Sequence, residues 1–74
     1  MKNFSDSFGN LNNFQVGDLV FWKKLNKKEL GVVSKLFLVE EGGRDVAYAT
    51  IFDLKDKKYV DLPTIILKIE KKKN

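Results

Sequence analysis

Short apolar runs rich in β-branched and aromatic residues begin at Phe14, and a cluster of turn-forming residues ends each run. The run 16–22 is a turn followed by β-branched and aromatic residues, and the run 30–39 is longer and of the same kind. Runs of β-branched and aromatic residues bounded by turn residues are typical of strands. The run 45–52 predicts a strand with Val46, Tyr48, Thr50 and Phe52 on one face and Ala47, Ala49 and Ile51 on the other.

Turns rich in glycine, charged residues and proline separate these runs and define where further strands start. Proline cannot donate a hydrogen bond to a strand ladder, so Pro63 ends a strand, and a single 3₁₀ turn is expected over 63–65. Gly42 and Gly43 suit a tight hairpin turn. The complete prediction has a polar loop at 23–29, turns at 40–43 and 53–57, and two more strands at 58–62 and 66–69.

Five short strands in a chain of 74 residues predict an all-β fold, and we expect a small five-stranded, partly open barrel. A five-stranded OB-type barrel is the alternative. It usually needs more residues and often a helix between strands three and four, for which this spacing leaves no room. The expected organisation is a single barrel over 14–70, preceded by a short arm at 1–13 and followed by a basic tail at 71–74.

The arm over 1–13 carries three large apolar residues, Phe4, Phe8 and Leu11, at steps of four and three. That spacing would put all three on one face of a short helical turn. One interpretation is an unstructured terminus with incidental aromatic residues. The other is an arm that docks Phe4 and Phe8 onto its own barrel or onto a neighbouring subunit, and both interpretations stay open.

Four segments of the chain carry a distinctive combination of residues. They are Val16-Gly17-Asp18-Leu19-Val20, Leu30-Gly31-Val32-Val33, Lys58-Tyr59-Val60-Asp61-Leu62-Pro63 and Leu67-Lys68-Ile69. In these segments the chain resembles, over roughly 14–70, the SH3-like barrels of the KOW, Tudor and CarD-type groups. The resemblance implies that the first segment opens strand one and the second starts strand two. The last two would supply strand four, the 3₁₀ turn and strand five.

The resemblance leaves the function open, because barrels of this kind bind RNA, read chromatin, dock on polymerases or serve structural roles. The CarD-type likeness implies a protein that docks on RNA polymerase, and Gly42-Gly43 before strand three fits that pattern. Short lysine-rich chains that open in this way also look like small barrels encoded by tailed bacteriophages, some of them virion components.

The composition excludes several kinds of chemistry. The chain has no cysteine and no histidine, so it has no disulfide, no thiolate metal site and no imidazole base. It also lacks a glycine-rich phosphate loop, and Asp53 and Asp56 look like turn formers. We therefore expect a protein that is not an enzyme and that uses no metal, cofactor or small-molecule substrate.

The expected environment follows from hydropathy. No apolar run approaches the ~20 residues of a membrane span, and 1–13 has no apolar block of the secretory kind. We expect a soluble protein without membrane contact, cytoplasmic or associated with a virion or other particle. A core of this size contributes only ~3–5 kcal/mol of net stability, so support from a protein partner or homo-oligomer is expected.

Lysines form the main candidate site. The net charge is +4, but residues 68–74 alone carry four lysines against one glutamate. Two other clusters surround the first and third predicted turns, which would emerge at the same end of an up-and-down sheet and make a phosphate-contacting patch. The alternative is a loop surface that only aids solubility. The clusters are Lys23, Lys24, Lys27 and Lys28, and Lys55, Lys57 and Lys58.

Aromatic residues lie beside both clusters, Trp22 at the first and Phe52 and Tyr59 at the second. Together they would form a stacking surface or an aromatic cage. The alternative is that Trp22 and Phe52 belong to the core. The candidate binding residues are therefore the seven lysines with Trp22 and Tyr59.

These features predict a non-catalytic binding module. The first hypothesis is an accessory factor that contacts nucleic acid or the transcription machinery through the lysine and aromatic residues at one end of the barrel. With Arg44 as the one arginine, nucleic-acid binding would be weak, salt-sensitive and independent of sequence. The second hypothesis is a structural subunit of an assembly such as a phage virion, docked by its arm and barrel edges. The third is a small inhibitor of a host enzyme.

Overall fold

The computed structural model describes residues 14–73, so Phe4, Phe8 and Leu11 of the predicted arm lie outside the described residues, as does Asn74. The described elements are β1 (Leu19–Lys24), β2 (Lys27–Glu41), β3 (Arg44–Asp53), β4 (Lys58–Pro63), η2 (Thr64–Ile66) and β5 (Lys68–Lys71). The predicted all-β fold with five strands is confirmed, and the 3₁₀ turn η2 lies one residue later than expected.

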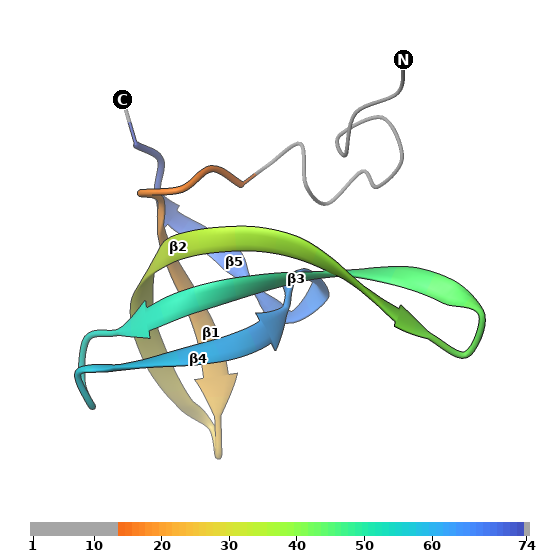
Figure 1. Ribbon diagram of the computed structural model, residues 1–74. Helices are drawn as coiled ribbons and strands as arrows, with labels where there is room; N and C mark the ends of the chain where they lie inside the picture. Colours follow the sequence, from red (N-terminus) through yellow and green to blue (C-terminus); the bar gives the residue numbers. More distant parts are fainter. Residues whose placement is uncertain (1–13, 74) are drawn as a thin grey trace.

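All five strands belong to one antiparallel sheet, in the spatial order β4-β3-β2-β1-β5 (Figure 1). The strands β1 to β4 follow one another as a meander joined by tight turns. The 3₁₀ turn η2 then carries the chain from β4 at one edge to the opposite edge, where β5 pairs with β1. Figure 1 shows how strongly β2 bends, so the sheet curls, but β4 and β5 do not pair and the sheet is not closed.

The hydrophobic core lies on one face of the curled sheet, the inner face. Because side chains alternate along a strand, this face takes every second residue, and the predicted alternation of 45–52 is confirmed, with the set of Ala49 and Ile51 buried. Val46, Tyr48, Thr50 and Phe52 are half-buried on the other side, the outer face. The buried cluster consists of Phe14, Val20, Trp22, Val33, Ala49, Ile51 and Leu67.

Gly31 allows β2 to run close over this core. A Cβ at this position would collide with the Ile51 side chain and lie only 2.8 Å from the Phe52 carbonyl oxygen. It would also lie 3.2 Å from Cη2 of Trp22. Glycine is therefore required here by the close approach of β2 to its neighbours.

The register of β2 against β3 shifts between Val33 and Lys35. From the pair of Phe37 and Tyr48, where β4 ends at Pro63, β2 and β3 continue as a two-stranded ribbon that projects from the sheet (Figure 1). Phe37 and Tyr48 stack on its outer face with ring centroids 5.9 Å apart. The Tyr48 hydroxyl donates a hydrogen bond of 2.8 Å to Glu41, which raises the pKa of Tyr48. The end of the ribbon, the acidic tip, exposes Glu40, Glu41, Arg44 and Asp45.

The predicted loop over 23–29 is wrong, because β1 and β2 both extend to a two-residue turn, Leu25-Asn26. Leu25 has a φ of 51° and Asn26 a φ of 66°. Two consecutive positive φ values are the geometry of a type I′ hairpin turn, which usually holds Asn-Gly or Asp-Gly. The sequence lacks such a pair at this place, and the pattern therefore indicated a longer polar loop.

Candidate functional site

The turn between β1 and β2 and the turn between β3 and β4 lie at the same end of the sheet, as the lysine pattern predicted. Lys24 and Lys27 from the first turn and Lys55 from the second line one depression of about 200 Å³. The lysine end comprises Lys23, Lys24, Lys27 and Lys28 around the first turn and Lys55, Lys57 and Lys58 around the second.

All seven lysines of the lysine end are exposed, whereas two of the three carboxylates within the same two segments are buried. Glu29 is 8% exposed and Asp53 is 6% exposed. Asp53 uses Oδ1 to accept hydrogen bonds from the backbone N–H groups of Lys55 at 2.9 Å and Asp56 at 3.2 Å, which forms the turn. Asp56 is the one carboxylate exposed in these two turns. The outer surface of the lysine end is therefore more basic than the order of residues along the chain suggests.

The β1–β2 hairpin carries lysines on both of its faces. Trp22 and Glu29 are paired in register and point inward, so strand alternation puts the next pair, Lys23 and Lys28, on the outer face. The pair of Lys24 and Lys27 is then on the inner side. Like charges directly opposite each other destabilise a strand pair, so each lysine pair costs stability unless an anion lies nearby.

Lys28 has such an anion within the chain. Its Nζ lies 2.8 Å from Oε1 of Glu70 in β5 and 4.4 Å from the centre of the Phe21 ring. Lys28 is therefore held against the outer face of the sheet. Its side chain remains 46% exposed.

A second depression of about 290 Å³ lies between β1 and β4. Its apolar lining includes Trp22, Val60, Leu62 and Ile66. Lys23, Lys24 and Lys58 lie along it with Asp53 and Asp56. This groove joins the second lysine cluster to the first across the open side of the sheet.

The predicted aromatic surface of Trp22, Phe52 and Tyr59 does not form. Trp22 is 6% exposed and belongs to the core on the inner face, whereas Tyr59 is 65% exposed. Tyr59 pairs in register with Phe52 on the outer face, where their rings meet edge to face with centroids 5.1 Å apart. The sheet therefore separates Trp22 from the other two rings, and a cage cannot be built from them.

Leu25 is the residue of this end that the sequence pattern missed. It lies within the predicted polar loop, but it occupies the first position of the two-residue turn and is 89% exposed. The signal that would have found it is a leucine inside a run of four lysines, Lys-Lys-Leu-Asn-Lys-Lys.

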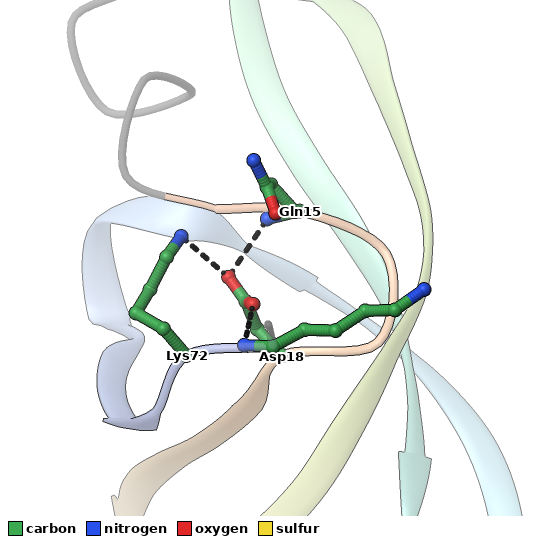
Figure 2. Close-up of polar contacts among 4 residues, drawn as sticks. Gln15, Asp18 and Lys72 are labelled. Carbon is green, nitrogen blue, oxygen red and sulfur yellow. Dashed lines mark hydrogen bonds and ion pairs between the residues drawn. The ribbon is translucent and has the colours of Figure 1, made fainter.

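The Gly17-Asp18 motif has a structural role at the opposite end of β1. The buried Asp18 carboxylate accepts hydrogen bonds of 2.8 Å from the backbone N–H of Gln15, from Nζ of Lys72 and from the backbone N–H of Lys73 (Figure 2). Burial alone would raise the pKa of Asp18, but these hydrogen bonds outweigh it and lower the pKa below 3.8.

The same contacts show that Lys72 and Lys73 of the predicted basic tail over 71–74 are bound to the rest of the protein. Lys71 pairs with Leu19 as the last residue of β5, and Lys72 and Lys73 bind Asp18. These three lysines are therefore fixed against the start of β1, far along the sheet from the lysine end.

Within residues 14–73, His, Cys, Asp and Glu side chains do not gather in threes where they would hold a metal ion. A helix with the length and apolarity needed to span a bilayer is likewise absent from this part of the chain. No protein-family model matches the chain, and no curated protein or solved structure is significantly similar to it.

Proposed function

We propose that this protein is a non-catalytic nucleic-acid-binding module whose lysine end contacts the phosphate backbone. One observation carries the proposal. Two separate turns place seven exposed lysines at one end of the sheet, and two of the three carboxylates in the same segments are buried. Surface lysines gathered in this way favour polyanionic partners, because neutralising phosphates releases the counterions condensed on them.

The same proposal includes the finer fold, an SH3-like barrel of the KOW, Tudor or CarD-type groups. The return of β5 to pair with β1 and the 3₁₀ turn between β4 and β5 support it. In this view the protein is an accessory factor of nucleic-acid or transcription machinery. Catalysis has no part in this role.

The mode of binding follows from the kind of cation present. Lysine offers a compact point charge, whereas base reading in the major groove mostly uses the planar guanidinium of arginine. Arg44, the one arginine, lies at the acidic tip, the opposite end of the ribbon from the lysine end. Binding at the lysine end is therefore directed at phosphates and independent of base sequence.

The test is a fluorescence titration of a labelled 20-bp DNA duplex at rising sodium chloride concentrations. The logarithm of the association constant should fall linearly with the logarithm of salt, by ~0.9 for each phosphate contacted. The double variant Lys24→Gln/Lys55→Gln should flatten this slope by about two contacts and weaken binding about tenfold at low salt.

Lys71→Gln is the matched control, because it removes one exposed lysine from β5 rather than from the lysine end. It should leave the affinity within about twofold of the unmodified protein. No binding by the unmodified protein even at low salt would overturn the proposal. An equal loss of duplex affinity in all variants would show that binding depends on the net charge of the whole protein and that the lysine end is not the site.

A second candidate is a structural subunit of a larger assembly, favoured by the opposite charges of the two ends. The acidic tip of one copy complements the lysine end of the next, and such head-to-tail contacts build rings or filaments. Sedimentation of the protein at low and high salt separates the two functions. Salt-sensitive oligomers without DNA favour assembly, and a monomer that binds duplex favours the module.

A further inference from the structure

Leu25 stands alone at the tip of the β1–β2 hairpin. It is 89% exposed, which makes it the most exposed large apolar side chain within residues 14–73. An exposed leucine is not unusual by itself, because much of a protein surface is apolar. The position of this leucine in the backbone makes it informative.

The backbone at Leu25 disfavours a leucine. Its φ of 51° lies in the left-handed region, where a side chain with a Cβ is crowded and where glycine or asparagine is usual. The side chain is not buried in return, so it contributes nothing to the core that would offset this cost. Neither the turn nor the packing of the sheet explains a leucine here.

The surroundings of Leu25 indicate what it meets. Behind it, Lys24 and Lys27 occupy one face of the hairpin, and Lys23 and Lys28 occupy the other. An apolar tip with cations on both sides fits between two rows of negative charge. The two phosphate backbones that border a groove of duplex DNA are such rows.

Resting on the proposed function, we propose that the β1–β2 hairpin enters the minor groove of duplex DNA and that Leu25 is an apolar wedge between neighbouring base pairs. The lysine pairs on the two faces contact the phosphates of the two strands. Proteins that insert one or a few apolar side chains at a base step unstack it and bend the duplex.

The amount of apolar surface distinguishes DNA from a lipid bilayer. Membrane attachment grows with the apolar area inserted, and a single side chain adds little to it. The other exposed large apolar side chains at the lysine end are not at the hairpin tip: Tyr59, 65% exposed, packs edge to face on Phe52, and Leu54 is only 37% exposed. A base step accepts one such side chain, so a lone leucine suits DNA better than a membrane.

The experiment compares Leu25→Gly with Leu54→Gly. Glycine suits the φ of 51° at position 25, so Leu25→Gly should fold with an unchanged or higher melting temperature. Its affinity for a 20-bp duplex should fall about tenfold to a hundredfold, the value of burying one leucine. A duplex with a donor and an acceptor dye at its ends should shorten on saturation with the unmodified protein, and should not shorten with Leu25→Gly.

Leu54→Gly removes a leucine from the neighbouring turn and should keep both affinity and bending. The wedge is overturned if Leu25→Gly binds and bends the duplex like the unmodified protein, or if it loses affinity while the bend remains. It is also overturned if Leu25→Gly loses binding to phosphatidylserine vesicles but not to DNA. The first of these results would leave phosphate binding by the lysine end intact. Absence of any DNA binding would instead overturn the proposed function itself.

Discussion

The two hairpin turns at the ends of β2 have the same backbone geometry and opposite chemistry. At the acidic tip, Gly42 and Gly43 have φ values of 60° and 81°, and carboxylates dominate their surroundings. At the lysine end, Leu25 and Asn26 have φ values of 51° and 66°, and lysines flank them on both sides. Both are two-residue turns with two positive φ values.

The difference lies in what explains each residue. Glycine adopts a positive φ without steric cost, so the backbone conformation alone explains the glycines at positions 42 and 43. Neither the backbone conformation nor burial explains the presence of leucine at position 25. A surface whose residues are explained by folding needs no partner, whereas a residue that folding disfavours points to a contact outside the chain.

Reversal of charge should have the largest effect and separate the two ends most clearly. The triple variant Lys24→Glu/Lys27→Glu/Lys55→Glu should weaken duplex binding by at least about a hundredfold at ~0.1 M salt, because three attractive contacts become repulsive. Reversal of Glu40 and Glu41 to lysine, measured in the same titration, should leave affinity unchanged or raise it slightly. Equal losses at both ends would show that the distinction between them is wrong.

Asp18→Asn should destabilise the fold without reproducing the loss of binding. The carboxylate accepts three hydrogen bonds, one of them in an ion pair with Lys72, at the far end of β1 from the Leu25 turn. Its loss should therefore cost about 2–3 kcal/mol in urea unfolding at neutral pH. Duplex affinity at low temperature, where the variant is still folded, should be unchanged. A matching fall in affinity would mean that binding depends on overall stability rather than on the lysine end.

The pH dependence of stability tests the same contact. The pKa of Asp18 is below its ordinary 3.8 in the folded protein, so its stabilisation is fully present above that value. It is lost as the pH falls below 3.8 through the lower folded pKa, because the unfolded chain then binds the proton more readily. Unfolding followed from pH 7 to pH 2 should show this acid loss in the unmodified protein. The Asp18→Asn variant should show a smaller loss.

The smallest expected effects lie in the turns themselves and have opposite signs. Gly43→Ala forces a Cβ into a φ of 81° and should destabilise the protein by about 1 kcal/mol. Leu25→Gly relieves the same kind of strain and should be neutral or slightly stabilising in the same urea titration. If Leu25→Gly is as destabilising as Gly43→Ala, then Leu25 packs in a way that serves the fold, and the contrast between the turns fails.

Local pattern was sufficient for most of the strands. Alternation of residues 45–52 predicted which side chains of β3 are buried, because a strand has a period of two whatever surrounds it. The position of Pro63 predicted the end of β4 and the 3₁₀ turn, because proline lacks the N–H that a ladder requires. The clustering of lysines at one end followed from strand order in a meander.

The sequence by itself therefore determined the number of strands, the period of burial and the end of the sheet at which the lysines gather, because these depend on local chemistry and chain order. Only the tertiary structure decided that Trp22 and Tyr59 lie on opposite faces and that Glu29 and Asp53 turn inward. It also decided that Lys72 and Lys73 bind Asp18 across more than fifty residues. The physical reason is that register and curvature are set by distant partners, which no local pattern contains.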